Sequence, residues 1–529
     1  MFVPLTPLRC LERALDLFPH KIGIVCGGRE FTYSEFGARA RRLASGLAKL
    51  GVNPGDRLAY LSFNTHRLLE SYFGVIQARS IVMPMNVRLS PQELAAILQH
   101  AGARYLFFEP EFEQLVAGLR QACPQLERTV ALGESSAAAD LTYEEIVESG
   151  QPEPAEIFTY DENSIAELFY TSGSTGAPKG VALTHRSLYL HALGVMNLCE
   201  DPNNTVDLHT IPLFHANGWG RPQVSTMLGF KQVMVRRFDP LTVFRLIEQH
   251  RATEMSLVPV MANMLLNAPE RTGHDLSSLK VILIGGAAAS PELIARMEQS
   301  FGCRVSAGYG LTETAPVLTM SRAKSTYAWK DEADRISRAA MAGWPMVGTR
   351  VRVVDLHGND VPRDMTSMGE VVAQGDNVME GYYREPEATA AVIEGNWFHT
   401  GDMAVWDEEG WIHIVDRKKE IIISGGENIS SIEVEKAIFA HEAVLECAVV
   451  AAPDDQWGEV PAALIVLKPG HSLTQETLLD FLSDRLGRFK MPRIIEFSED
   501  PLPKTGTGKI RKNVLKHRYW VGKDKRVQG

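Results

Sequence analysis

The chain contains the stretch Tyr170-Thr171-Ser172-Gly173-Ser174-Thr175-Gly176-Ala177-Pro178-Lys179-Gly180, which holds three glycines, four serine or threonine hydroxyl groups and one lysine in eleven residues. The apolar run Ile165–Tyr170 leads into it and predicts a strand. Glycines let backbone N–H groups approach an anion, and the hydroxyl and lysine side chains add donors and positive charge. A flexible Gly/Ser linker would need neither the strand nor the pair Pro178-Lys179. The stretch therefore predicts a phosphate-binding loop.

This loop is not a Walker A motif, because its lysine follows a proline and precedes Gly180. It resembles the phosphate loop of the AMP-forming acyl-CoA synthetases, a superfamily that includes adenylation domains and beetle luciferases. The resemblance implies an ATP site made by Thr171, Ser172, Gly173, Ser174, Thr175, Gly176 and Lys179. It also implies that Thr171 takes part in catalysis and in binding Mg²⁺.

Length and composition indicate a soluble enzyme with more than one domain. The 529 residues exceed a single core, and 45% apolar with 22% charged residues is ordinary for a globular enzyme. A net charge of −11 argues against a dedicated nucleic-acid-binding protein. Six scattered cysteines form no Cys-x-x-Cys pair, and neither a secretory signal nor an apolar run of ~20 residues is visible. We expect a cytoplasmic protein, with loose contact to a membrane surface and a homodimer left open.

Strand and helix patterns alternate through most of the chain. Apolar runs predict strands at 58–61, 105–108, 233–235 and 281–284, with amphipathic segments between them. This alternation indicates an α/β fold with a largely parallel sheet. Residues 134–164 predict a polar connection, and 210–215 are expected to end a strand. Two segments, Thr32–Glu35 and Ser90–Glu93, have the spacing of helix capping boxes.

The composition predicts where the domains divide. Residues 347–415 are rich in short strands and turns, which is typical of a β-subdomain. The charged run 416–420 follows, and a smaller βα pattern continues to the end. We predict a large N-terminal domain of α/β layers with a β-subdomain over 1–418, and a small mobile α+β domain over 419–529.

Two further motifs match the same family. Tyr309-Gly310-Leu311-Thr312-Glu313 offers an aromatic face, a hydroxyl group and a carboxylate, which suit a purine, a phosphate and Mg²⁺. It resembles the second ATP-binding motif, which implies a catalytic and metal-binding role for Glu313. The resemblance also implies nucleotide contacts from Gly286, Ala287, Ala288, Tyr309, Gly310 and Thr312.

The last motifs lie toward the C-terminus. Asp402 follows a predicted glycine turn, and a carboxylate there suits the two hydroxyl groups of a ribose. The resemblance implies that Asp402 and Arg417 bind this ribose and that Lys419 is the hinge. The segment Pro503–Lys512 resembles the final motif, whose lysine, here Lys509, reaches ATP and acts in catalysis. The pair Gly425-Gly426 is implied to bind coenzyme A.

The acid-binding residues indicate an apolar substrate. Amino-acid-activating relatives carry an aspartate where this chain has His215, and the segments 258–265, 285–289 and 306–311 carry no charge. The resemblance assigns the acyl pocket to His215, Trp219, Gly285 and Gly308, with Trp219 as a gate.

The implied reaction has two steps and three substrates. A carboxylic acid and Mg·ATP give an acyl-adenylate and pyrophosphate, and coenzyme A then takes the acyl group and releases AMP. A medium- or long-chain fatty acid is expected, with an aromatic or other small acid as the runner-up. A carrier protein as acceptor, a luciferase activity and an inactive nucleotide-binding scaffold stay open as alternatives.

Overall fold

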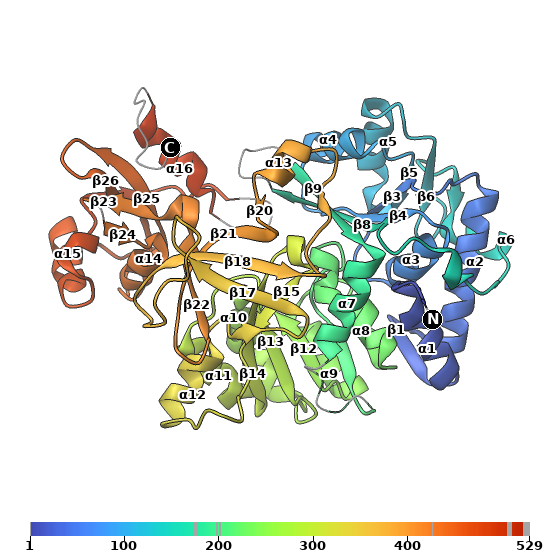
Figure 1. Ribbon diagram of the computed structural model, residues 1–529, viewed down its shortest axis with the longest axis horizontal. Helices are drawn as coiled ribbons and strands as arrows, with labels where there is room; N and C mark the ends of the chain where they lie inside the picture. Colours follow the sequence, from blue (N-terminus) through green and yellow to red (C-terminus); the bar gives the residue numbers. More distant parts are fainter. Residues whose placement is uncertain are drawn as a thin grey trace. The chain divides into compact units, whose positions relative to one another are not determined.

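The computed structural model describes residues 2–172, 178–196, 199, 201, 203–425, 427–504 and 510–521 (Figure 1). The chain divides into two compact units. The first contains Met1–Val351, Val372–His399 and Glu409–Ile412, and the second contains Arg352–Val371, Thr400–Glu408 and His413–Gly529. The domain boundary between 418 and 419 stays a prediction.

A nine-stranded sheet forms one half of the first unit. Its order is β16-β15-β14-β13-β12-β10-β11-β1-β2, with parallel neighbours from β14 to β1 and antiparallel strands at both edges. Its strands are β1 (Ile22–Cys26), β2 (Arg29–Thr32), β10 (Val206–His209), β11 (Lys231–Met234), β12 (Glu254–Leu257), β13 (Val281–Ile284), β14 (Arg304–Gly310), β15 (Val317–Met320) and β16 (Trp344–Pro345).

An eight-stranded sheet forms the other half, in the order β19-β9-β8-β4-β3-β5-β6-β7. It is parallel from β8 to β7, and the β8–β9 and β9–β19 pairs are antiparallel. Its strands are β3 (Arg57–Leu61), β4 (Ile81–Pro84), β5 (Tyr105–Phe108), β6 (Arg128–Ala131), β7 (Leu141–Thr142), β8 (Ile165–Ser172), β9 (Pro178–Thr184) and β19 (Gly381–Tyr382).

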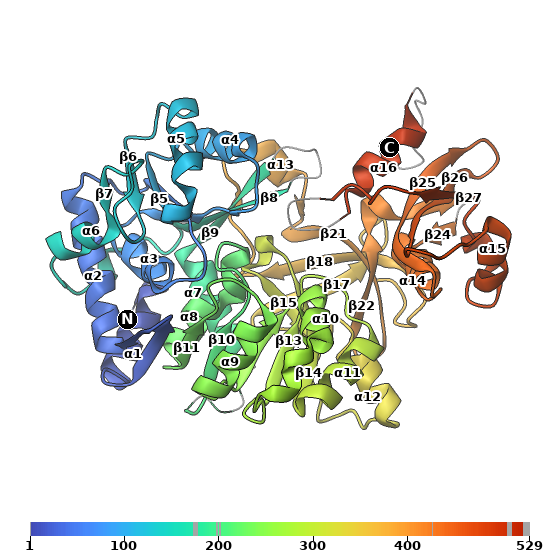
Figure 2. The ribbon, with the colours of Figure 1, turned by 180° about the vertical axis from the view of Figure 1, so that it is seen from behind.

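Helices lie in three layers separated by these two sheets (Figures 1 and 2). The central layer contains α1 (Leu8–Leu17), α2 (Tyr33–Lys49), α3 (His66–Gln77), α7 (His185–Met196) and α8 (Arg221–Met227). The outer layers contain α9 (Pro240–His250), α10 (Pro259–Asn267) and α11 (Pro291–Phe301) on the nine-stranded sheet, and α4 (Pro91–Ala101) and α5 (Glu113–Ala122) on the eight-stranded one. Successive strand residues alternate between layers, as Ile24 and Val25 do. The predicted α/β layers are confirmed.

The local signals agree with the structure in most places. Capping boxes start α2 at Thr32 and α4 at Ser90, as predicted. The prediction of a polar connection over 134–164 is wrong in part, because β7 and α6 (Tyr143–Ser149) lie within it and Thr142 caps that helix. The strand expected to end within 210–215 ends earlier, at His209, since the next residues bond to side chains instead of a neighbouring strand.

The predicted β-rich region forms a five-stranded sheet. Its order is β17-β18-β21-β20, and β22 pairs with β21. The elements of this region are β17 (Thr349–Val354), β18 (Gly369–Gly375), α13 (Pro386–Ala390), β20 (Ile393–Glu394), β21 (Trp397–Trp406) and β22 (Ile412–Arg417), and α12 (Glu332–Ala339) precedes it.

The end of the chain forms an α+β layer structure within the second unit. Its strands are β23 (Ile422–Ser424), β24 (Glu427–Ile429), β25 (Val444–Asp454), β26 (Gly458–Leu467) and β27 (Ile494–Ser498). The helices α14 (Ser431–Phe439) and α15 (Gln475–Ser483) pack on one face, and α16 (Lys512–Trp520) packs on the other through Leu515. Among the helices of the described residues, none combines the length and apolar character that crossing a bilayer requires.

Candidate active site

A hairpin brings two predicted phosphate ligands to one end of the eight-stranded sheet. The antiparallel register of β8 and β9 puts Thr171 opposite Lys179. The ladder extends to the pair Ser172 and Pro178, which flank the predicted loop. The remaining predicted ligands of this loop lie outside the described residues, and their roles stay predictions: Gly173, Ser174, Thr175 and Gly176.

Tyr382 lies between two of the predicted ligands. The Nζ atom of Lys179 is 4.7 Å from the centroid of the Tyr382 ring, and the Tyr382 hydroxyl donates to Glu313 Oε1 at 3.0 Å. Burial, reinforced by the charge of Glu313, raises the pKa of Tyr382, so this hydroxyl remains a donor at neutral pH. Sequence reasoning missed Tyr382, because only the pairing of β19 with β9 brings it here.

Glu313 stands in the short 3₁₀ turn η5 (Thr312–Thr314), directly after β14. The turn needs a glycine at 310, since a Cβ there would lie 1.8 Å from the carbonyl oxygen of Pro316. The predicted phosphate ligand Thr312 is buried beside Glu313. One carboxylate suits Mg²⁺, which proteins often hold by one or two carboxylates together with substrate phosphates. Glu313 therefore fits the predicted metal site, and Thr171 as a second ligand stays a prediction.

The predicted adenine-binding segments follow neighbouring strands. β13 and β14 are parallel, with Ile284 opposite Ala307, so the loop after β13 and Tyr309 on β14 lie at the same sheet edge. Gly286 adopts φ +74°, a conformation that favours glycine. The adjacent Ala287 and Ala288 are exposed.

Three of the four predicted acyl-pocket residues lie together. A Cβ built on Gly285 would be 3.0 Å from Cη2 of Trp219 and 3.3 Å from the carbonyl oxygen of Gly308. A Cβ on Gly286 would be 3.7 Å from Cζ2 of the same indole. The ring of Trp219 therefore packs against the backbone of Gly285 and Gly286 and stays partly exposed. Trp219 is thus a partly buried side chain at the edge of the hydrophobic core, not a fully buried one.

Trp219 belongs to a left-handed turn. The five residues from Ala216 to Gly220 all have φ between +41° and +75°. A left-handed conformation costs roughly 1–2 kcal/mol for each residue that carries a Cβ. At Gly220 the backbone needs glycine twice, for its φ of +75° and because a Cβ would be 2.5 Å from Cε1 of His191. Such strain persists only where surrounding contacts hold it.

Buried side chains fix the chain just before the turn and the strand beside it. Asn64 donates to the carbonyl oxygen of Ile211 and accepts from Leu213 N, and the Tyr72 hydroxyl donates to the carbonyl oxygen of Leu213 at 2.6 Å. Nε2 of His191 accepts from Val317 N at 3.1 Å, and burial lowers the pKa of His191 to about 3, so the ring is neutral. The segment before the turn is thus fixed by buried polar groups, and the neutral His191 ring lies against Gly220 at its end.

His215, the fourth predicted pocket residue, precedes the turn. The loss of water around its ring and the positive charge of Arg88 lower the pKa of His215, although part of the residue stays exposed. Arg88 also lines a cavity of about 410 Å³ together with Phe63, Phe214, Arg236 and others. This cavity combines aromatic walls with guanidinium groups.

The predicted ribose ligands form an ion pair in the second unit. Nε of Arg417 donates to Oδ1 of the buried Asp402 at 2.7 Å. The predicted glycine turn before Asp402 is wrong, because Thr400 to Asp402 lie inside β21. Gly401 only distorts this strand, with φ +71°. The chain pairs with its neighbours here, which no local turn signal reveals.

Two further predicted residues lie in the described part of the second unit. Lys419 is in the 3₁₀ turn η6 (Lys418–Glu420), and its carbonyl oxygen accepts from Nζ of Lys516 at 3.5 Å. Gly425 has φ +60°, and a Cβ there would be 2.7 Å from Cε3 of Trp457. Sequence reasoning missed Trp457, which covers Gly425. Gly426 and Lys509 lie outside the described residues.

A family model agrees with this arrangement. The model described as AMP-binding enzyme matches residues 11–383, and the model of the AMP-binding enzyme C-terminal domain matches 433–509. The chain belongs to the AMP-binding enzyme family. The predicted likeness to AMP-forming acyl-CoA synthetases is therefore confirmed. The first match includes the hairpin, Glu313 and Tyr382, and the second includes Lys509.

Full-length relatives of this AMP-binding enzyme carry different names. A long-chain-fatty-acid–CoA ligase of Thermus thermophilus is 38% identical and covers 96% of this chain and 94% of its own. A feruloyl-CoA synthase of an Amycolatopsis species is 39% identical, with 96% and 98% covered. The solved anthranilate CoA ligase in complex with anthranoyl-AMP has a TM-score of 0.84 at 26% identity, with 98% of both chains covered.

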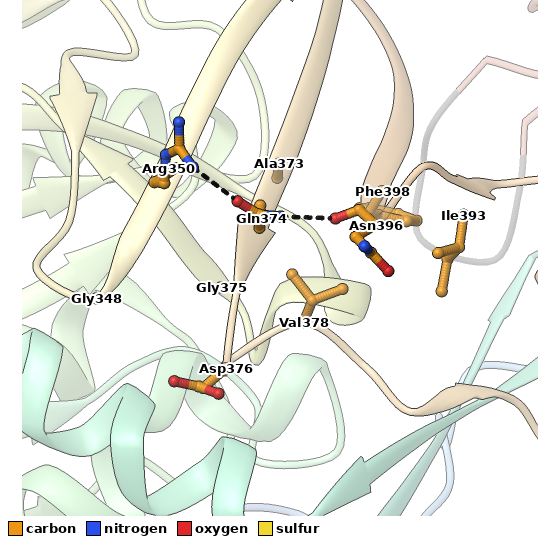
Figure 3. Close-up of a pocket in the computed structure, with 10 residues that line it drawn as sticks. All are labelled: Gly348, Arg350, Ala373, Gln374, Gly375, Asp376, Val378, Ile393, Asn396 and Phe398. Atoms are coloured by element: carbon orange, nitrogen blue, oxygen red, sulfur yellow. Dashed lines mark hydrogen bonds between the residues drawn. The ribbon is translucent and has the colours of Figure 1, made fainter.

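A second cavity of the AMP-binding enzyme lies apart from the predicted residues (Figure 3). It has about 420 Å³ and is lined by residues of β17, β18 and the β20–β21 hairpin. Nη1 of Arg350 donates to Oε1 of Gln374 at 3.1 Å, and Nε2 of Gln374 donates to the carbonyl oxygen of Asn396 at 3.2 Å. None of the predicted site residues within the described ranges lines this cavity.

Proposed function

We propose that this AMP-forming acid–CoA ligase activates a medium- or long-chain fatty acid. The observation that carries the proposal is the indole of Trp219 packed against Gly285 and Gly286. The segments expected around the acid carry no charge. An apolar chain would displace or slide past the indole and bury methylene groups, whereas an amino acid would find no carboxylate for its ammonium group.

The adenylation step needs positioning and charge neutralisation. Lys179 and the predicted loop would hold the phosphates of ATP, and Glu313 would bind Mg²⁺ with the phosphate oxygens. The Tyr382 hydroxyl would keep the Glu313 carboxylate oriented toward the metal. Asp402, fixed by Arg417, would accept from the ribose hydroxyl groups. Lys509 would neutralise charge at the reacting carboxylate and the α-phosphate.

The thioester step uses coenzyme A and the second unit. The Gly425 segment, with Trp457 against it, is our candidate for contact with the pantetheine arm. The guanidinium groups of Arg88 and Arg236 suit the phosphates of coenzyme A. A change of domain orientation about Lys419 would exchange Lys509 for this segment between the two steps. We place the reaction in the cytoplasm.

An aromatic acid is the second candidate. Two of the three relatives named above act, by their names, on feruloyl and anthranilate groups. The flat face of Trp219 would stack on an aromatic ring.

A series of saturated acids, ferulate and benzoate separates the two candidates by pyrophosphate release with free coenzyme A. Each buried methylene contributes about 0.8 kcal/mol, and 1.4 kcal/mol is a factor of ten. Two methylenes should thus raise kcat/KM by roughly tenfold until the pocket ends. Trp219→Ala should flatten this profile without changing the KM for ATP. A preference for ferulate or benzoate over octanoate and palmitate would refute the fatty-acid proposal and leave the adenylation chemistry intact.

A further inference from the structure

Glu167 is a buried acid whose side-chain partners are two amides. It lies on β8, fully buried, five positions before Ser172. Oε2 accepts from Nδ2 of Asn217 at 3.2 Å, and Oε1 lies 2.6 Å from Nε2 of Gln223. Within the described part of the chain, no lysine, arginine or histidine forms an ion pair with it. Burial raises the pKa of Glu167 to about 8, and the two amides offset only part of that rise.

The two amide partners stand on either side of Trp219. Asn217 is the second residue of the left-handed turn and is fixed at both ends, since its Oδ1 accepts from Gly220 N at 2.7 Å. Gln223 lies in the first turn of α8, which starts directly after the left-handed turn. Glu167 therefore bonds the chain before and after the indole.

These hydrogen bonds stabilise the strained backbone of the turn. Ala216, Asn217 and Trp219 all have positive φ although each carries a Cβ. Without an anchor, such residues return to the ordinary right-handed or extended regions. Relaxation at Asn217 would turn the backbone at Trp219 and move its ring away from Gly285. The hydrogen bond between Asn217 and Glu167 opposes this relaxation.

The position of Glu167 also connects two parts of the site. The same strand continues through Thr171, opposite Lys179, toward the predicted phosphate loop. The indole side of the site and the phosphate side thus share one rigid element. Loops alone could not fix their separation, because a strand in mid-sheet is held by neighbours on both sides.

We infer that Glu167 is a positioning residue that holds the Trp219 turn through Asn217 and Gln223 and thereby sets which acids the enzyme accepts. The inference rests on the proposed function in one respect, namely that the substrate acid binds beside Trp219. The inference does not depend on which carboxylic acid the enzyme activates. The test therefore uses the ratio of kcat/KM between the best acid of the parent enzyme and a second acid two methylenes shorter or one ring smaller.

The key comparison is between Glu167→Leu and Glu167→Gln in the full chain. Leucine removes both hydrogen bonds, and we expect the ratio to fall by about tenfold or more while the KM for ATP stays within about twofold. Glutamine has nearly the same shape, accepts from Asn217 and pairs with the Gln223 amide. It should keep the ratio within about twofold of the parent. The emission of Trp219, read as the difference from the same variant carrying Trp219→Phe, should become easier to quench with acrylamide only in Glu167→Leu.

Two more variants make the test decisive. Asn217→Gly keeps a residue that tolerates positive φ and deletes the amide, so it should reproduce the change in ratio even if Glu167→Leu folds poorly. Glu70→Gln is the matched control, because Glu70 is equally buried but bonds to Arg39 and Tyr143. It should lower stability and leave the ratio unchanged.

The failure of this inference is distinct from that of the proposed function. If the parent prefers a small or aromatic acid, the fatty-acid proposal is wrong and the ratio still tests Glu167. If Glu167→Leu and Asn217→Gly keep the parent ratio, or Glu70→Gln changes it equally, then Glu167 is merely structural and the inference is overturned.

Discussion

Helix α8 lies between the two large sheets, and each sheet holds it with a buried carboxyl group of a different charge state. Asp207 on β10 accepts from Nε of Arg221 at 2.8 Å and from the Ser225 hydroxyl at 2.7 Å. Glu167 on β8 meets the amide of Gln223 and no cation in the described structure. Both carboxyl groups have almost no exposed surface.

The difference shows that the partner determines the charge of a buried acid. Burial alone would raise the pKa of both groups. At Asp207 burial is outweighed by the Arg221 guanidinium together with His209, whose Nε2 lies 3.2 Å from Oδ2, and the pKa is held well below its ordinary value. At Glu167 the amides compensate weakly, and the pKa rises to about 8. The ion pair fixes the helix start to the core, whereas the neutral acid fixes the turn that carries Trp219.

The largest effect is expected from breaking the ion pair. Arg221→Met removes the guanidinium beside the buried Asp207, leaving only the His209 ring and the Ser225 hydroxyl against the carboxylate, and also removes the bond to Glu254. The expected loss of unfolding free energy is about 3–5 kcal/mol, measured by urea titration. Arg251→Met is the control, since its pair with Asp275 is exposed to solvent and should contribute little to stability. Equal losses in the two variants would contradict the comparison.

Breaking the neutral contact should cost less. Glu167→Leu leaves the buried amides of Asn217 and Gln223 without their acceptor, and an unsatisfied buried polar group costs about 1–3 kcal/mol. The same urea titration measures the loss. A cost above that of Arg221→Met would indicate an ionised Glu167 and would overturn the assignment of charge.

The pH dependence of folding stability should differ between Glu167 and Asp207. Glu167 has a folded pKa of about 8 against an ordinary 4.5, so unfolding releases its proton between these values. The parent should therefore lose stability relative to Glu167→Gln as the pH rises from about 5 to 8, and the difference should level off above that range. Thermal midpoints between pH 5 and 9 test this.

Asp207 provides the opposite case. Its folded pKa is low, so its contribution to stability is complete above the ordinary value and is lost only on acidification. The cost of Asp207→Asn should accordingly stay constant from pH 5 to 9. A slope equal to that of Glu167→Gln would show that the two sites do not differ in charge.

The smallest effect is expected at Gly285, against which the Trp219 ring packs. Gly285→Ala adds a methyl group 3.0 Å from the Trp219 ring, so the ring must shift by a few tenths of an ångström. We expect a change of about two- to fivefold in the acid preference and a stability change below about 1 kcal/mol. Gly273→Ala, where the new methyl group meets open space, is the control and should change neither. An unchanged preference in Gly285→Ala would separate the ring position from selectivity.

The sequence by itself determined the local features, which depend only on residues close together in the chain. The capping boxes at Thr32 and Ser90 form because their partners are three residues away on the same turn. The loop after β13 and the Gly310 turn are predictable for a similar reason, since apolar strands and glycine turns act locally. Family motifs extended this to Lys179, Glu313, Asp402 and Arg417, whose pairings the structure shows in part.

Only the tertiary structure decided which distant segments meet. Glu167 lies in an otherwise apolar strand, and the sequence around it does not predict that Asn217 and Gln223 are its partners. Tyr382 enters the site through a two-residue strand, and the turn at Ala216–Gly220 contradicts the local preference of its Ala and Trp residues. The reason is physical: long-range packing between the two sheets compensates for strain and burial that each segment alone would avoid.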